Sequence, residues 1–134
     1  MNILLDAMGG DNAPDANIKG ALKAVNQIKA TITLVGKEEV IRNKVKEFTG
    51  KEIEEVSDRL KIKNATETIE MEDGPTDAIR HKKDSSMVVG FKMLKENEDD
   101  VFISAGNSGA LLAGATLIVG RIKGIDRPAL AGIL

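Results

Sequence analysis

Apolar residues along the chain follow two alternating patterns. Short apolar runs are separated by longer segments in which apolar residues recur every three or four positions. The first pattern predicts strands, and the second predicts helices that bury one face. The runs predict strands at residues 2–5, 32–35, 60–63, 101–103 and 129–134. The periodic segments predict helices at residues 14–29, 38–48, 75–81 and 87–96, and a further helix from residue 110.

Strands that alternate with helices favour an α/β domain with a mainly parallel sheet and helices on both faces. In the first helix, Ile18, Val25 and Ile28 are expected to face the sheet. The loops after parallel strands gather at one edge of the sheet. We therefore expect residues 6–14 and 104–109 to face one another across a cleft, with residues 80–86 closing a third side.

The stretch DDVFISAGNSGALLAGATLIVGR, residues 99–121, reads as a buried strand, a turn of small residues and a helix. This arrangement aims free backbone N–H groups at an anion. Asn107 or Ser108 either donates to a phosphate oxygen or simply caps the helix. A Walker A loop and a dinucleotide fingerprint are both missing from this stretch. The candidate phosphate-binding residues here are Ser104, Gly106, Asn107, Ser108 and Gly109.

A second loop of small residues, DAMGGDNAP at residues 6–14, carries two carboxylates. Asp6 ends the first strand, at the position where open α/β sheets bind ligands. Gly9 and Gly10 permit a backbone path that is closed to other residues or allow close approach to a ligand. Pro14 suits the first turn of the next helix.

The segment at residues 80–86 combines basic side chains with hydroxyl groups. Ser85 or Ser86 is expected to cap the helix at residues 87–96. Lys82 and Lys83 either contact an anion or a partner, or form an ordinary solvated helix end.

The composition restricts the possible classes of function. The chain has 134 residues, 42% of them apolar and 30% charged, which is typical of a soluble globular domain. Its net charge of −2 argues against nucleic-acid binding. There is no Cys, and His81 is the only histidine, so thiolate chemistry is excluded and a Ser-His-Asp triad is not favoured. We expect a cytoplasmic protein without a signal peptide or a membrane-spanning segment.

Four motifs, in order, resemble those of one family, the PlsX phosphate acyltransferases. They are DAMGGDNAP, KKDSSM, SAGNSGAL and VGRIKGIDRPAL, which begin at residues 6, 82, 104 and 119. The resemblance covers the whole chain. The family more often has Thr at the position of Ser108, a change that keeps the hydroxyl. Because family members are much longer, the chain is expected to be their N-terminal portion.

The resemblance implies a three-layer α/β/α fold related to the isocitrate and isopropylmalate dehydrogenases. It implies that acyl-[acyl carrier protein] and orthophosphate react to give acyl phosphate, which feeds phosphatidic acid synthesis through a membrane glycerol-3-phosphate acyltransferase. It also implies a homodimer that associates peripherally with the membrane, without a cofactor or metal. Arg127 lies in an Arg-Pro-Ala segment similar to one near the site of phosphate acetyltransferases, so it is expected either to contact phosphate or to form a salt bridge with Asp126 or another acid.

This reaction suits the residues, because orthophosphate is itself the nucleophile. The protein must hold a dianion against a thioester carbonyl, and backbone N–H groups, hydroxyls and an arginine suit that task. Asp6 or Asp11 either orients a donor or accepts a proton, although Asp6 alternatively only caps N–H groups of its loop. Asn107 is expected to meet the developing oxyanion.

Two other classes of function fit less closely. A non-catalytic module that binds a phosphorylated ligand is the main alternative. An isopropylmalate-type dehydrogenase would need a metal-binding carboxylate cluster and a dinucleotide site, and the sequence shows neither motif. The isolated chain is expected to have negligible acyltransferase activity.

Overall fold

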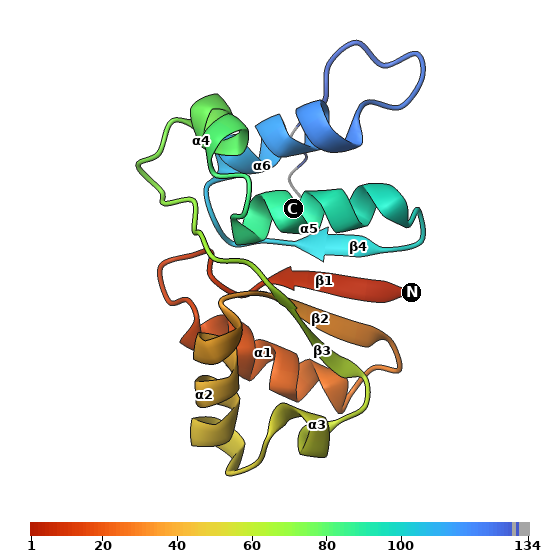
Figure 1. The fold of residues 1–134 in the computed structure, drawn as a ribbon. Coiled ribbons are helices and arrows are strands. Elements are labelled where there is room, and N and C mark those ends of the chain that lie inside the picture. The colour runs from red at the N-terminus through yellow and green to blue at the C-terminus, as the bar shows by residue number, and fades with distance from the viewer. Residues whose placement is uncertain (130, 132–134) are drawn as a thin grey trace.

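The computed structural model describes residues 1–129 and 131, which form one parallel sheet with helices on both of its faces (Figure 1). The sheet has four strands in the order β3-β2-β1-β4. The strands are β1 (Asn2–Asp6), β2 (Thr31–Gly36), β3 (Leu60–Asn64) and β4 (Val101–Ile103). Each agrees with a predicted strand to within one residue at either end.

The helices form the two outer layers of the fold (Figure 1). On one face lie α1 (Asp15–Val25), α2 (Glu38–Thr49) and the short α3 (Ile53–Val56). On the other face lie α4 (Pro75–His81), α5 (Ser86–Glu96), α6 (Ser108–Gly114) and the π-helical turn η1 (Ala115–Val119). The expected three-layer α/β/α architecture is confirmed. Within the described residues, every helix is too short or too polar to cross a membrane.

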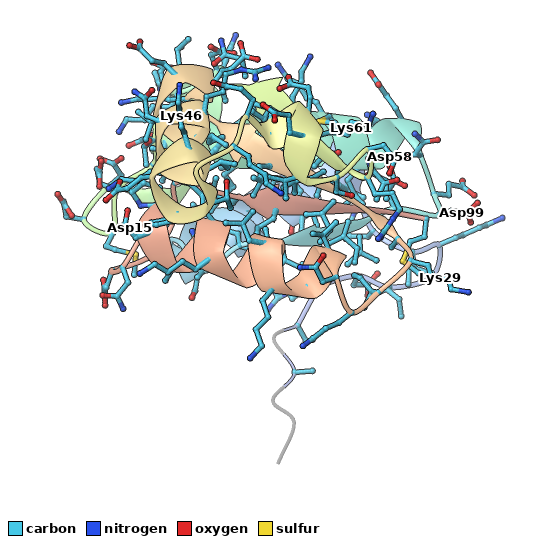
Figure 2. The ribbon with its side chains drawn as sticks, turned by 90° about the horizontal axis from the view of Figure 1, so that it is seen from below. Asp15, Lys29, Lys46, Asp58, Lys61 and Asp99 are labelled. Carbon is cyan, nitrogen blue, oxygen red and sulfur yellow. The ribbon has the colours of Figure 1, made fainter. Side chains whose placement is uncertain are left out.

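The strand order reverses between β1 and β4. The chain builds β2 and β3 on one side of β1 and then crosses back to place β4 on the other side. Such a reversal is where open α/β sheets bind ligands, at the carboxyl ends of the strands. Asp15, at the start of α1, lies at this end of the molecule, and Lys29 and Asp99 lie at the opposite end (Figure 2). The topology therefore brings the loops after β1 and β4 together.

Each face of the sheet has its own hydrophobic core. On the α1–α3 face the core includes Ile18, Val25, Leu34, Ile41 and Val45, all fully buried. On the other face it includes Met87, Val88, Phe91 and Ala110. Burial of each large apolar side chain contributes about 1.5–3 kcal/mol. The rings of Phe91 and Phe102 meet edge to face with centroids 5.0 Å apart, which fixes α5 against β4.

The prediction for the end of the first helix was wrong. The apolar spacing predicts a helix to residue 29 with Ile28 facing inward, but α1 ends at Val25 and Ile28 is 37% exposed. The guanidinium of Arg59 donates to the carbonyl oxygens of Val25 at 2.8 Å and Ile28 at 2.6 Å. These bonds satisfy carbonyl groups at the helix end, so the chain can turn away toward β2.

The prediction that β4 is buried was also wrong for the described part of the chain. Val101 and Ile103 are 44% and 49% exposed, because β4 lies at the edge of the sheet and pairs with β1 alone. An apolar run cannot distinguish an edge strand from a central one. The strand predicted at residues 129–134 falls mainly on residues outside the described part.

Candidate active site

The carboxylate of Asp6 joins three segments at the carboxyl end of β1. It is 2% exposed. Its Oδ1 accepts hydrogen bonds from the backbone N–H groups of Met8 and Gly9, both at 3.1 Å, and from the Ser86 hydroxyl at 2.6 Å. Its Oδ2 accepts a hydrogen bond from the Ser104 hydroxyl at 2.8 Å. One side chain thus links its own loop, the start of α5 and the end of β4.

These bonds explain how a carboxylate can be buried at this position. A charged acceptor strengthens each bond, and four donors replace the water that the carboxylate loses. The Ser104 oxygen also accepts a bond from the Gly106 N–H at 3.1 Å, which extends the network into the loop after β4. Asp6 therefore caps N–H groups of its loop, as one of the two interpretations from the sequence expected. Its catalytic role stays a prediction.

Gly9 and Gly10 let the loops after β1 and β4 touch. A Cβ atom on Gly9 would lie 2.6 Å from Oδ2 of Asp6 and 3.1 Å from the backbone N and Cα of Gly106. Gly10 has a φ of +111°, and a Cβ there would lie 3.2 Å from Ala105. The glycines are thus needed for contact between two loops, a reason that the sequence pattern does not distinguish from contact with a ligand.

Asn17 holds the first loop from the side of α1. Its Nδ2 lies within hydrogen-bond distance of the carbonyl oxygens of Asp6 at 3.1 Å, Ala7 at 3.1 Å and Gly9 at 2.9 Å. The Asn17 amide therefore fixes the positions of three backbone carbonyl groups in the loop after β1. Sequence reasoning missed this residue, because a polar residue in a helical segment carries no sign of the loop that it contacts.

Asn107 plays a similar part in the second loop. Its Oδ1 accepts a hydrogen bond from the Ala110 N–H at 3.1 Å, which caps α6. Its Nδ2 lies 3.0–3.3 Å from the carbonyl oxygens of Glu70, Met71 and Asp73. The capping interpretation is confirmed. The side-chain amide already contacts protein carbonyls, so Asn107 ties the start of α6 to residues 70–73.

The start of α6 still has backbone donors to offer. Among the described residues, no acceptor is found for the N–H groups of Ser108 and Gly109, which open the helix. The Ser108 side chain is exposed beside them. These are the donors that an anion at this turn would use.

Lys82 is engaged within the chain. Its Nζ donates to the carbonyl oxygen of Thr68 at 2.8 Å and to the carboxylate of Asp73 at 2.6 Å. The bond to Asp73 raises the pKa of Lys82, and the bond to Lys82 holds the pKa of Asp73 below its ordinary value. The pair fastens residues 68–73 to the end of α4, beside the segment that Asn107 holds.

The remaining candidate residues occupy different environments. Ser85 is fully buried and caps α5, since its Oγ accepts a bond from the Val88 N–H at 3.2 Å. Asp11, Lys83 and Arg127 are exposed. Within the described part of the chain, no hydrogen bond or ion pair joins any of these three side chains to the loops after β1 and β4. The same part contains no group of three acidic or histidine side chains that could hold a metal ion.

Comparison with known proteins gives concordant matches. A family model described as "Fatty acid synthesis protein" matches residues 1–134. Proteins named "Phosphate acyltransferase" are similar to the chain: the one from Acetivibrio thermocellus is 54% identical over 135 residues, and that from Thermoanaerobacter pseudethanolicus is 52% identical over 135 residues. The one from Clostridioides difficile is 48% identical over 134 residues. Each match covers 100% of this chain but 38% of the relative.

Proposed function

The chain belongs to the fatty acid synthesis protein family of PlsX phosphate acyltransferases, and from this premise we propose that it forms the N-terminal, phosphate-binding portion of such an enzyme. The reaction is the transfer of an acyl group from acyl-[acyl carrier protein] to orthophosphate. A phosphate oxygen attacks the thioester carbonyl carbon, and the carbon–sulfur bond breaks. The phosphate proton ends on the carrier thiol, so the products are acyl phosphate and free carrier protein.

The observation that carries the proposal is the meeting of the two glycine-rich loops where the strand order reverses. The unused N–H groups of Ser108 and Gly109 and the Ser108 hydroxyl lie at the start of α6. Such donors suit a phosphate dianion and the oxyanion that develops on the thioester carbonyl. Positioning and electrostatic stabilisation are enough for a reaction whose nucleophile is supplied by the substrate.

In this proposal the buried polar side chains position the site. Asp6, through Ser86 and Ser104, holds the three segments together, and Asn107 holds the helix start against residues 70–73. The exposed Asp11 and Arg127 enter the proposal from the sequence and the family resemblance alone. Asp11 would accept the phosphate proton, and Arg127 would pair with the phosphate.

The proposed partners and location rest on the family resemblance. They are acyl carrier protein as donor, a homodimer in the full-length enzyme, and a cytoplasmic protein that associates peripherally with the membrane. There, glycerol-3-phosphate acyltransferase would consume the acyl phosphate for phospholipid synthesis. Because the chain spans 38% of its relatives, we expect negligible turnover from the chain alone.

The test uses a graft, in which this chain replaces the matched 135 residues of the Acetivibrio thermocellus relative. With acyl carrier thioester, the graft should release carrier thiol and form acyl phosphate, trapped as a hydroxamate, only when phosphate is present. The unmodified relative is the positive control, and the isolated chain is the fragment control. Phosphate binding without thiol release by a folded graft would instead identify a non-catalytic binding module.

A further inference from the structure

The two adjacent lysines between α4 and α5 lie in different surroundings. Lys82 is engaged with Thr68 and Asp73, as described above. Lys83 is exposed and lines a depression of about 340 Å³ on the surface of the molecule. The proposed phosphate site gives Lys83 no role, so the depression is the place to look for one.

Three lysines from separate segments line this depression. Lys63 lies near the end of β3, Lys83 lies in the turn before α5, and Lys92 lies on α5. All three are exposed, and none of them forms an ion pair within the part of the chain that the structure describes. Elsewhere on the surface, Arg42 and Lys44 each pair with two carboxylates. The depression thus presents three ammonium groups around one hollow without a paired carboxylate.

The two carboxylates in the depression, on Asp84 and Glu96, balance these lysines only in part. Oδ2 of Asp84 accepts hydrogen bonds from the backbone N–H of Thr66 at 3.0 Å and from its hydroxyl at 2.5 Å. These two bonds, and less strongly the charges of Lys92 and Lys63, hold the pKa of Asp84 below its ordinary value. Three lysines against two carboxylates leave an excess of one positive charge, on a chain whose net charge is −2. The depression is therefore a local basic surface on an acidic chain.

The floor of the depression is apolar. Val89 and Met93 line it, and Val89 is buried while Met93 is half-buried. An apolar centre with a charged rim is the arrangement of protein–protein interfaces. A site for a small anion would instead place hydrogen-bond donors at its centre. The lining therefore favours a protein partner with acidic side chains.

The depression lies at the same end of the sheet as the candidate active site. Asn64, the last residue of β3, lines the depression, and Asp6 is the last residue of β1. In a parallel sheet these two strand ends lie at one edge, with only β2 between them. Asp84 also lines the depression, and two residues further on the Ser86 hydroxyl donates to the Asp6 carboxylate at 2.6 Å. A protein bound here could bring a tethered group to the loops after β1 and β4.

We propose that this three-lysine depression docks an acidic face of the protein that carries the donor thioester. Carboxylates of the carrier would pair with Lys63, Lys83 and Lys92, and an apolar side chain would rest on Val89 and Met93. Such charge pairs speed up the encounter and fix the orientation of the two proteins. The identity of the partner rests on the proposed function, whereas the surface belongs to the chain whatever its reaction.

The experiment measures binding and turnover separately. Labelled acyl carrier protein is titrated against the isolated chain and against the graft. The double variant Lys63→Glu/Lys92→Glu should weaken binding at least about tenfold, and the binding that remains should depend less on salt. In the graft its KM for the carrier thioester should rise, while kcat/KM for the same acyl group on N-acetylcysteamine stays unchanged, because that donor needs no docking.

Two further variants keep this test specific. Lys23→Glu/Lys29→Glu makes the same change of charge at exposed lysines, of which Lys29 lies at the opposite end of the molecule (Figure 2), and it should leave carrier binding unchanged. A carrier in which acidic residues are replaced by lysine should bind the Lys63→Glu/Lys92→Glu variant more tightly than it binds the unsubstituted chain. If the charge reversal lowers Tm, Lys63→Gln/Lys92→Gln takes its place and should still weaken binding of the unmodified carrier.

Four results would overturn the proposal. The first is carrier binding that neither the chain nor the graft shows, and the second is binding that both double variants weaken equally. The third is an equal loss of kcat/KM with both thioesters, because the lysines would then act on the chemical step. The fourth is loss of inorganic phosphate binding with unchanged carrier binding, because the depression would then hold a small anion. A graft that binds the carrier through these lysines but turns over neither thioester would refute the proposed reaction and support the docking surface.

Discussion

The loops after β1 and β4 resemble one another in sequence, since both are rich in glycine and both lead into a helix, yet they use their polar groups differently. In the loop after β1, the Asp6 carboxylate accepts hydrogen bonds from two backbone N–H groups, and the Asn17 amide lies within hydrogen-bond distance of three backbone carbonyl oxygens. In the loop after β4, the Asn107 side chain accepts a hydrogen bond from one backbone N–H group. The backbone N–H groups of Ser108 and Gly109 have no acceptor among the described residues.

This difference assigns different physical tasks to two similar loops. The first loop is held up to Gly9 by Asp6 and Asn17 and contacts the second loop through its glycines, so this part acts as a support. At its exposed tip, the backbone N–H groups of Asp11 and Asn12 have no acceptor among the described residues. The second loop presents unused donors at a helix start, where an anion gains most from them. A glycine-rich turn alone therefore does not identify a phosphate site. What favours the second loop is that its unused donors belong to the first residues of a helix, whereas those of the first loop precede α1.

The largest effect is expected from removing the support at Asp6. Asp6→Ala leaves two buried and two partly buried donors without their acceptor, each at about 1–3 kcal/mol when buried, so we expect a loss of about 4 kcal/mol. Asp6→Asn should cost about 1.5–3 kcal/mol, because the amide keeps an oxygen for three donors and the Ser104 hydroxyl can turn to accept. Urea denaturation of the graft measures the loss of stability in both variants. Unchanged stability of Asp6→Asn together with lost turnover of the graft would make Asp6 a catalytic residue instead.

The next effect concerns the contact between the two loops. Gly10 adopts a φ of +111°, which valine rarely adopts, and the strain should cost about 1–3 kcal/mol. Gly10→Val should also displace Ala105 and with it the loop after β4, so turnover of the graft should fall much more than its stability does. Turnover and Tm are measured on the same preparation. Near-normal turnover would show that the position of the first loop does not matter to the second.

A smaller effect is expected at Asn107, where two functions can be separated. Asn107→Ala removes the helix cap, at about 0.5–2 kcal/mol, and the contacts with three carbonyls. We expect turnover of the graft to fall at least about tenfold, because the start of α6 and its backbone donors would be displaced. Asn107→Asp keeps the cap but sets a carboxylate against those carbonyls. If this second variant behaves like the unsubstituted graft, the cap alone is important and the tie to residues 70–73 is not.

The pair of Lys82 and Asp73 should give a modest dependence of stability on pH. The bond to Lys82 lowers the pKa of Asp73 from 3.8, so its contribution is complete above that value and is lost as the pH falls through the lower folded pKa. The bond to Asp73 raises the pKa of Lys82 from 10.5, so its contribution is complete below that value and is lost as the pH rises through the higher folded pKa. Lys82→Met removes the pair, so the fall of Tm at acidic pH and the fall of Tm at alkaline pH should both become smaller. Lys83→Met, at an exposed neighbour, is the control and should leave the profile unchanged.

Much of the fold could be predicted from the sequence, because hydrophobic periodicity is a local property of each element. The meeting of residues 6–14 and 104–109 could be predicted too, since parallel strands place their loops at one edge. From the segment at residues 80–86, which links two helices, Ser86 joins them through Asp6. Asn17 and the pair of Lys82 and Asp73 could not be predicted, because each joins residues that only the folded chain brings together. Gly9 and Gly10 show the same limit. The sequence indicates that another group approaches these glycines closely, but it does not indicate that this group is the loop after β4.

The smallest effect, and the sharpest test of the second loop, is expected at Ser108. Its exposed side chain makes no hydrogen bond within the described residues, so neither substitution here should change stability by more than about 0.5 kcal/mol. Ser108→Thr keeps the hydroxyl and should leave turnover and KM for phosphate nearly unchanged. Ser108→Ala removes the hydroxyl but keeps the backbone N–H, so its KM for phosphate should rise while its loss of turnover stays below that of Asn107→Ala. Steady-state kinetics of the graft at varied phosphate separate these cases. If Ser108→Ala also leaves KM unchanged, the hydroxyl is not a phosphate ligand, and an anion at this turn is held by backbone N–H groups alone.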